Sequence, residues 1–210
     1  MQKHSVIGLI VATMAEAGPF LKNMSLKRME DAVFPVYENK HLILVVSGIG
    51  KANGAMATAY CCTRFEPVCI CNLGAAGATA GGRLGAVYGV GEIVEYDRPK
   101  FKTGRPQLHK PNVLAGFELK RLATQDRPVV TALEREAVAA HAELVDMEAA
   151  DIVQTSKRFG VDCYVFKYVT DTPENETHRD VVENVKKYVD NIYDVFQQRI
   201  LPELGATPCP

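Results

Sequence analysis

Residues 144–171 read "LVDMEAADIVQTSKRFGVDCYVFKYVTD": a short apolar run, a stretch of helical character, and a longer apolar run. Val- and Ile-rich runs that alternate with helices are typical of an α/β domain with a largely buried sheet. Asp146 and Glu148 stand at the end of the first run, and Asp171 at the end of the second. A buried carboxylate must find partners or change its protonation state. This stretch therefore points to functional polar groups at the ends of buried strands.

The same alternation continues along the whole chain. We predict strands at 5–12, 42–47, 68–73, 86–96, 119–124, 143–146 and 162–169. We predict helices at about 51–65, 131–140, 147–159 and 178–198. Thr131 and Glu134 fit a capping box, and Thr177 can cap the last helix. The expected fold is α/β: a single domain over residues 1–200 with a central mixed, largely buried β-sheet flanked by helices, followed by a loose C-terminal tail, 201–210.

The composition argues against several classes of partner. The 210 residues suit one buried core, and 24 Lys and Arg nearly balance 25 Asp and Glu without a long basic run. We therefore expect no nucleic-acid partner. The apolar "SVIGLIVATMA" is too short to span a bilayer and has no cleavage pattern after it, so we expect no membrane contact and a cytoplasmic protein. The cysteines lie mostly in apolar runs rather than in zinc-site spacings, which favours buried thiols and no metal: Cys61, Cys62, Cys69, Cys71, Cys163 and Cys209.

Residues 97–118 are polar, basic and rich in Pro and Gly, which predicts a loop. A solvated loop is the simpler interpretation. The alternative is a lid over an anionic or polar substrate, formed by Lys100, Lys102, Arg105, His109 and Lys110.

Four loops are expected directly after strands, where ligands bind in open α/β sheets. They contain Glu16 in "ATMAEAGPF", Ile49 in "SGIGKANG", Gly74 and Ala75 in "NLGAAGATAGG", and Thr170 and Asp171 in "VTDTPEN". Neither glycine-rich loop matches a dinucleotide fingerprint or a P-loop, so nicotinamide, kinase and GTPase chemistry are disfavoured.

The combination of segments is more specific than any one of them. In order, "IGLIVATMAEA", "VVSGIGKANGAMATA", "ICNLGAAGA", "GVGEIVEYD" and the stretch 144–171 resemble the purine and uridine phosphorylase superfamily. They look most like its nucleosidase branch, the methylthioadenosine/adenosylhomocysteine nucleosidases. The resemblance implies a nucleoside phosphorylase-like fold, hydrolysis of the N-glycosidic bond of a purine nucleoside (by preference adenine, with or without a 5′ substituent), no cofactor, and a homodimer.

The resemblance also assigns roles to individual residues. Asp171 matches the acid that protonates the purine at N7, which requires a carboxyl group that burial keeps protonated. Glu148 matches the residue that holds the ribose hydroxyls, with Met147 beside the sugar. Glu16 matches the carboxylate that activates the attacking water. Val129 falls where the family reads the base edge with backbone groups. Without the family, each carboxylate has a simpler interpretation as a helix or turn cap.

Some positions depart from the family pattern, and they keep alternatives open. Ala75 replaces a serine near the water, Lys167 and Tyr168 replace "RA" of "RAISD", and Asp146 replaces a glutamate. The chain is also short between about 97 and 140, which raises the hypothesis of a bulkier 5′ substituent than methylthio. The competing functions are phosphorolysis to ribose 1-phosphate and non-catalytic nucleoside binding. Phosphorolysis needs a cationic pocket, for which only Arg83 and the distant Lys51 stand in or near the glycine-rich loops.

Overall fold

The computed structural model describes residues 6–79, 81–174 and 178–205. The strands are β1 (Ile7–Val11), β2 (Lys27–Arg28), β3 (Val36–Glu38), β4 (Leu42–Val46), β5 (Cys69–Ala78), β6 (Val87–Pro99), β7 (Pro106–His109), β8 (Leu119–Thr124), β9 (Leu144–Asp146) and β10 (Asp162–Asp171). The helices are α1 (Met14–Asn23), α2 (Lys51–Phe65), α3 (Ala132–Ala139), α4 (Ala149–Arg158), α5 (His178–Val195) and α6 (Leu201–Gly205), with a π-helical turn at Phe196–Ile200.

The sheet is organised around the long strand β5. This strand pairs in parallel with β1 and β10, and its end pairs antiparallel with β9. β10 continues to β6, β6 to β8, and β8 to β9, so these five strands close into a ring through β5. Beyond β1 the sheet extends through β4, β3 and β2. The prediction of a central mixed sheet is confirmed, and the closure of the ring is an addition to it.

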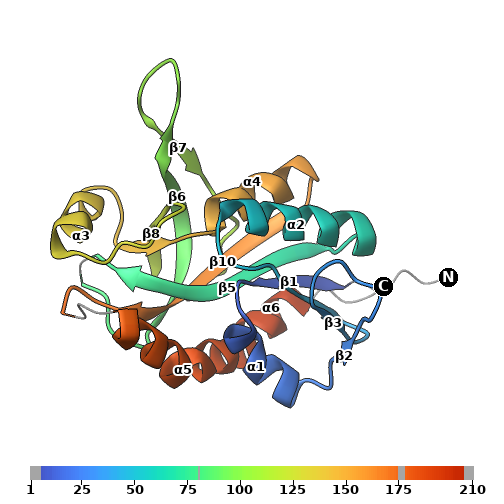
Figure 1. Cartoon of the computed structure of the whole chain (residues 1–210). Coiled ribbons are helices and arrows are strands. Elements are labelled where there is room, and N and C mark those ends of the chain that lie inside the picture. The colour runs from blue at the N-terminus through green and yellow to red at the C-terminus, as the bar shows by residue number, and fades with distance from the viewer. Residues whose placement is uncertain (1–5, 80, 175–177, 206–210) are drawn as a thin grey trace.

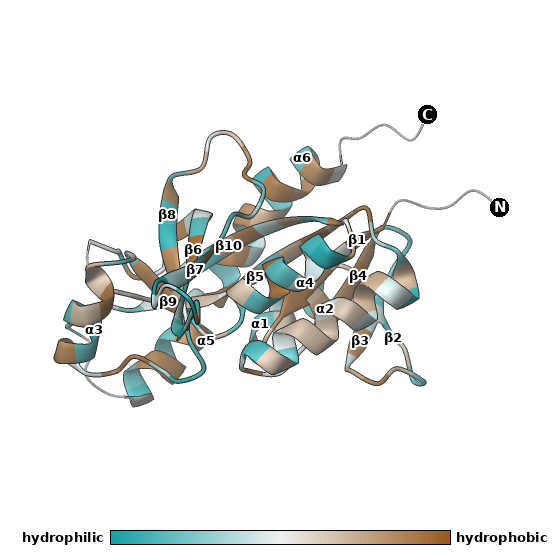
Figure 2. Ribbon diagram, turned by 90° about the horizontal axis from the view of Figure 1, so that it is seen from above, coloured by the Kyte–Doolittle hydropathy of each residue, from teal (hydrophilic) through white to brown (hydrophobic). Residues whose placement is uncertain are grey.

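Helices cover both faces of the sheet. In Figure 1, α2 and α4 lie on one side of the central strands, and α1 and α5 lie on the other. All residues of β1 and β4 are buried, as expected of strands covered on both faces, and Figure 2 shows them as hydrophobic. Cys209 lies outside the described residues, and the other cysteines are free and buried: Cys61, Cys62, Cys69, Cys71 and Cys163. No helix in the described ranges is long and apolar enough to cross a membrane.

Several predicted elements are confirmed and others need correction. The helix at 51–65, the strand at 119–124 and the capping box of Thr131 with Glu134 are all present. The predicted loop from Asn72 is wrong, because β5 continues through Ala78 and pairs with β10 along this length. The prediction missed α1, β2, β3 and β7. Thr177, the expected cap of the last helix, lies outside the described residues.

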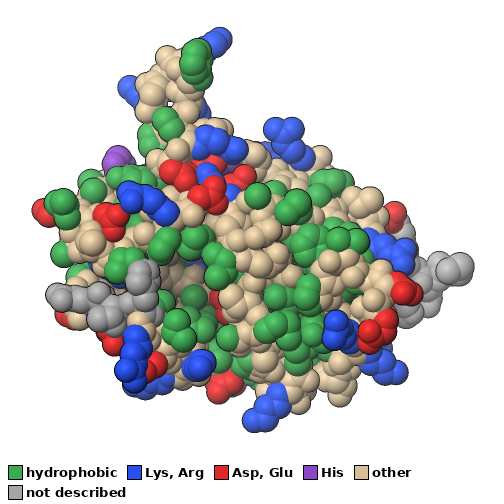
Figure 3. Space-filling model, in the orientation of Figure 1, with side chains coloured by type: hydrophobic (Ala, Val, Ile, Leu, Met, Phe, Trp, Pro, Cys, Tyr) green, Lys and Arg blue, Asp and Glu red, His purple; other side chains and the backbone are tan. Residues whose placement is uncertain are grey.

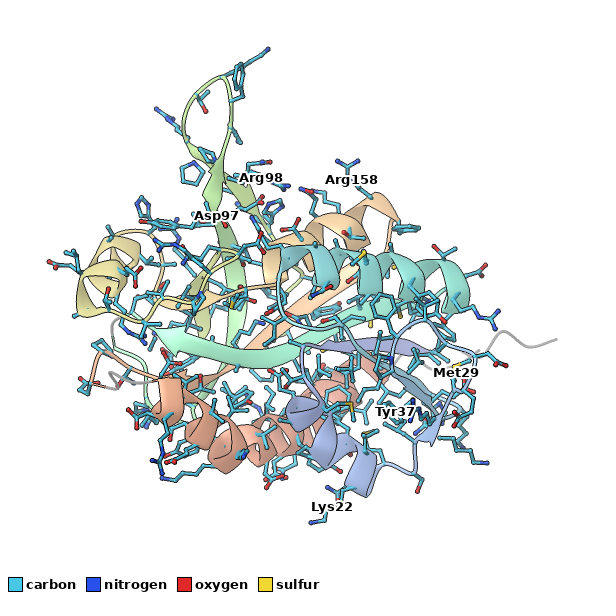
Figure 4. All side chains as sticks on the ribbon, in the orientation of Figure 1. Lys22, Met29, Tyr37, Asp97, Arg98 and Arg158 are labelled. Carbon is cyan, nitrogen blue, oxygen red and sulfur yellow. The ribbon has the colours of Figure 1, made fainter. Side chains whose placement is uncertain are left out.

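The basic segment from residue 97 is partly a hairpin rather than a loop. β6 runs to Pro99 and pairs with β7, and the hairpin projects from the body of the protein (Figure 1). Asp97 and Arg98 lie at its base (Figure 4), close to the fully buried Glu95. Glu95 is 3.3 Å from Lys51 Nζ and 2.6 Å from Arg98 Nε. The ion pairs therefore anchor the hairpin to the start of α2.

The C-terminal region is more ordered than predicted. Residues Leu201–Gly205 form α6 directly after the π-helical turn, and Leu204 is buried against the sheet's apolar cluster. The prediction of a loose tail is therefore wrong for residues 201–205, because these apolar side chains pack on the core. Residues 206–210 lie outside the described residues.

Gly8 provides a test of how tightly the core is packed. A Cβ at Gly8 would lie 2.7 Å from Ile70 Cδ1 and 2.8 Å from Cys61 Sγ, and both of these side chains are fully buried. Gly8→Ala should therefore lower the free energy of unfolding by about 1–3 kcal/mol in urea denaturation. Gly18→Ala is the matched control because nothing lies within 4 Å of its Cβ position in α1, and it should cost nothing. Equal stability of the two variants would contradict this packing.

Candidate active site

A cavity of about 390 Å³ lies at the carboxyl ends of β1, β5 and β10. Figure 3 shows a hollow, with hydrophobic side chains at its rim, on the face that carries α3 and α5. Eight of the nine predicted site residues line this cavity: Glu16, Ile49, Ala75, Val129, Met147, Glu148, Thr170 and Asp171. The chain thus brings together residues from both ends of the sequence.

Glu16 is both a helix-capping residue and a wall of the cavity. It lies in the first turn of α1 rather than in the predicted loop, forms a capping box with Thr13, and is 4% exposed. Its Oε2 accepts hydrogen bonds from the backbone N–H groups of Ala12 and Thr13, and its Oε1 accepts from the N–H of Ala75 at 2.9 Å. These donors fix the carboxylate toward β5. The simpler interpretation as a helix cap is therefore compatible with a place in the cavity wall.

Glu148 occupies the N-cap position of α4, but its side chain makes no capping hydrogen bond. Instead, its Oε1 accepts from the backbone N–H of Gly50 at 2.8 Å, at the start of α2. Burial, and next the negative charge of Asp146, raises the pKa of Glu148 to about 7. No described residue forms an ion pair with Glu148, so its carboxyl group is available to accept hydrogen bonds from a ligand.

Asp146 and Lys167 form a buried ion pair behind Glu148. Lys167 Nζ lies 2.8 Å from Asp146 Oδ2, and the same oxygen accepts from the backbone N–H of Ala149, which caps α4. Although burial alone would lower the pKa of Lys167, the Asp146 carboxylate raises it above its ordinary value. Lys167 therefore keeps its charge inside the protein. Asp146 acts as a support that positions the helix carrying Glu148 at its start.

Asp171 is held by two donors at the end of β10. Its Oδ1 accepts from the hydroxyl of Thr170 at 2.8 Å, and its Oδ2 accepts from Arg135 NH2 at 2.5 Å. The sequence-based expectation relied on burial to keep this carboxyl group protonated, and Asp171 is indeed 5% exposed.

Gly74 is the one predicted site residue that does not line the cavity. A Cβ at Gly74 would lie 3.1 Å from Glu16 Oε1 and 3.4 Å from Lys167 Nζ. The close approach that this glycine permits is therefore made by Glu16 rather than by a ligand. Its role in the site is to make room for the carboxylate.

Arg135 is the site residue that sequence reasoning missed. It lies in α3 between two glutamates, a context typical of a solvated helix face, yet it is 2% exposed and lines the cavity. A signal was available, because Arg135 is one helical turn before the buried Val138 and therefore on the apolar face of α3. The aliphatic wall of the cavity from α5 was also not predicted: Val181, Val182 and Val185.

The cations expected to form a lid lie elsewhere. None of Lys100, Lys102, Arg105, His109 and Lys110 is among the residues that line the cavity, and the hairpin that carries most of them points away from the body. His109 instead contacts Glu95 at 3.2 Å. Among the described residues, three cations do line the cavity, namely Arg127, Arg135 and Lys186.

The chain is similar in sequence to known nucleosidases. The chain is 27% identical over 227 aligned positions to a 5′-methylthioadenosine/S-adenosylhomocysteine nucleosidase of Marinomonas sp. (strain MWYL1), covering 93% of this chain and 98% of that protein. A segment of 77 residues is 38% identical to the enzyme of the same name from Bacillus pumilus, covering 36% of this chain and 33% of that protein. No family model matches the chain.

Solved structures show the same fold. The apo form of 5′-methylthioadenosine nucleosidase from Arabidopsis thaliana superposes with a TM-score of 0.86 at 18% identity, covering 99% of this chain and 98% of that chain. A futalosine hydrolase mutant of Helicobacter pylori superposes with a TM-score of 0.81 at 16% identity, covering 92% of this chain and 97% of that chain. The chain is thus similar in sequence to methylthioadenosine/adenosylhomocysteine nucleosidases and has the fold of these solved structures.

Proposed function

We propose that this chain is an N-ribosyl hydrolase that cleaves the N-glycosidic bond of a purine nucleoside and releases the free base. One observation carries the proposal: Glu16, Glu148 and Asp171, which come from three distant parts of the sequence, line one cavity. Adenine nucleosides with a 5′ substituent, such as methylthioadenosine, are the first candidates because the similar Marinomonas enzyme is named for them. The aliphatic wall from α5 suits an apolar 5′ substituent.

The three carboxylates match the three tasks of the reaction. When the bond between C1′ and N9 breaks, its electron pair passes to the purine and the sugar becomes a ribosyl cation. Asp171 stands at the base, where the purine gains a proton at N7. Glu148 accepts hydrogen bonds from the ribose hydroxyls, and its charge favours the cation. Glu16 accepts a proton from the water whose oxygen bonds to C1′, so the products are free base and ribose.

The position of Glu16 favours water over phosphate as the nucleophile. Its carboxylate is fixed beside Ala75 by four hydrogen bonds, and the donors are Ala12, Thr13 and Ala75. A phosphate anion at the same place would meet this negative charge. Lys51, one of the cations considered for phosphate, is instead paired with Glu95 and Asp97.

The family resemblance also supports a homodimer in the cytoplasm without a cofactor. In the described part of the chain, no group of three or more His, Cys, Asp or Glu side chains is arranged to hold a metal ion. Light scattering of the purified protein tests the dimer.

The products identify the reaction. Incubation of the purified protein with methylthioadenosine in phosphate buffer should release adenine together with a sugar that carries no phosphate, as measured by mass spectrometry. Formation of the ribose 1-phosphate derivative would show a phosphorylase instead. Tight binding of adenine without any turnover on a panel of nucleosides would show a binding protein.

Asp171→Asn tests the residue at the base. The amide keeps the size of the side chain and its hydrogen bond from Arg135, but it cannot exchange a proton with N7. We expect kcat to fall roughly 100-fold or more while KM changes little. Thr79→Val is a control at a buried hydroxyl outside the cavity, where the hydrogen bond to Ala142 O is lost. If Asp171→Asn has the same kcat as the wild type, Asp171 does not take part in the proton transfer.

The raised pKa of Glu148 predicts a pH dependence of activity. In the free protein, this group is protonated below about pH 7 and charged above it. Because the charged form accepts from the ribose hydroxyls, kcat/KM should rise with pH up to about 7 and then level off. Glu148→Gln retains an acceptor for Gly50 but cannot titrate, so kcat/KM should fall roughly 10- to 100-fold and lose this rise. If kcat/KM of the variant still rises with pH as in the wild type, the rise belongs to the titration of another group.

The same variant also tests the cost of burying this carboxylate. Because the pKa of Glu148 is raised from 4.5 to about 7, its contribution makes the folded protein less stable as pH increases between these values. The loss at pH 8 is about 3 kcal/mol. In urea denaturation, Glu148→Gln should therefore stabilise the unliganded protein at pH 8 relative to pH 5. If Glu148→Gln has a lower free energy of unfolding than the wild type at pH 8, the result would contradict the raised pKa of Glu148.

A further inference from the structure

Arg135 is a buried cation in the wall of the cavity. It is 2% exposed, and among the described residues only Ala78 and Asp171 accept hydrogen bonds from it. NH1 donates to the backbone oxygen of Ala78 at 2.9 Å, and NH2 donates to Asp171 Oδ2. A guanidinium group has five N–H groups in a planar fork, so donors remain for a ligand. Arginine is almost never this buried unless it is paired, which makes its position specific.

The backbone of β5 is shaped to accommodate this pair. A Cβ at Gly77 would lie 2.7 Å from Asp171 Oδ2 and 3.2 Å from Arg135 NH1. The absence of a side chain at this position therefore lets the carboxylate and the guanidinium meet over the strand. Gly77 itself lines the cavity, so the pair faces the space that a ligand would occupy.

The pairing changes what this end of the cavity can offer to a purine. Both of its oxygens accept hydrogen bonds, from Thr170 and from Arg135. Arg135 still has N–H groups from which no described residue accepts a hydrogen bond. The guanidinium therefore adds hydrogen-bond donors to this end of the cavity, next to Asp171.

Purines differ in the groups that they present beside N7. A 6-aminopurine presents an acceptor at N7 and a donor at its amine, whereas a 6-oxopurine presents two acceptors, N7 and O6. A protonated carboxyl group, with one donor and one acceptor, matches the first pattern. A guanidinium fork, which only donates, matches the second. Asp171 alone would therefore favour adenine, and Arg135 adds the donors that a 6-oxopurine needs.

We propose that Arg135 is a specificity-determining residue that extends the substrates of this site to 6-oxopurine nucleosides by donating to O6. Asp171 orients the guanidinium in this role. The inference rests on the proposed function, because it assumes that the purine lies at the Asp171 end of the cavity.

The experiment compares two nucleosides that differ only at position 6, methylthioinosine and methylthioadenosine. We expect the wild type to cleave both, and Arg135→Met to lower the ratio of kcat/KM for the oxo over the amino substrate at least tenfold. Arg121→Met is the control: it also breaks an arginine–carboxylate pair, with Glu92 at 3.0 Å, but it lies outside the cavity and should leave the ratio within twofold. A merely structural role of Arg135 would lower both activities together and leave the ratio unchanged.

Two outcomes overturn the inference, and a binding measurement separates it from the proposed function. The inference is wrong if the wild type cleaves only methylthioadenosine. It is also wrong if Arg135→Met is active and its ratio of kcat/KM for the oxo over the amino substrate equals that of the wild type. If Arg135→Met does not fold, Arg135→Lys, which keeps the charge without the fork, should show the same direction of change. If the wild type cleaves neither nucleoside, the hydrolase proposal fails. Calorimetry of Arg135→Met with free bases then tests the role of Arg135. If the variant loses binding of hypoxanthine but retains binding of adenine, the inference is supported; if it loses both equally, the inference is rejected.

Discussion

The parallel pairing of β5 with β10 is the constraint on which the rest of the site depends. It runs from Asp162 opposite Cys69 to Asp171 opposite Gly77, and both strands continue past the point where a loop was expected. Because the two strands end together, Asp171 comes to lie over a position without a side chain. The same pairing sets Lys167 beside Gly74, so that its amine lies close to Glu16. A shift of one residue in this register would move these side chains to the opposite face of the sheet.

The site separates its buried charges by giving each a different partner. Asp146 is paired with Lys167, Asp171 with Arg135, and Glu16 with backbone N–H groups. Among the described residues, Glu148 accepts a hydrogen bond only from the N–H of Gly50, and it is the carboxylate whose pKa is raised to about 7. Burial costs a carboxylate least where donors or cations surround it. The incomplete pairing of Glu148 is therefore what leaves it available to a ligand.

Structural and functional interpretations of the same residue turn out to be compatible here. Glu16 completes the capping box of α1 and also faces the cavity, because the first turn of that helix starts at the carboxyl end of β1. Glu148 stands at a helix N-cap, yet its side chain crosses to α2. The sequence pattern alone left these alternatives open, since a capping residue and a ligand-binding residue use the same chemistry at the same kind of strand end.

Local patterns in the sequence determined the α/β class, most buried strands, and the carboxylates that meet at the cavity, because hydrophobic periodicity and strand-end positions are local properties. Tertiary structure alone decided three features. β5 continues through "GAAGA" because β10 pairs with it along this length. The ring of strands closes because β5 pairs with both β9 and β10. Arg135 meets Asp171 because its side chain reaches from α3 to the end of β5, a contact between residues 36 positions apart that no local pattern encodes.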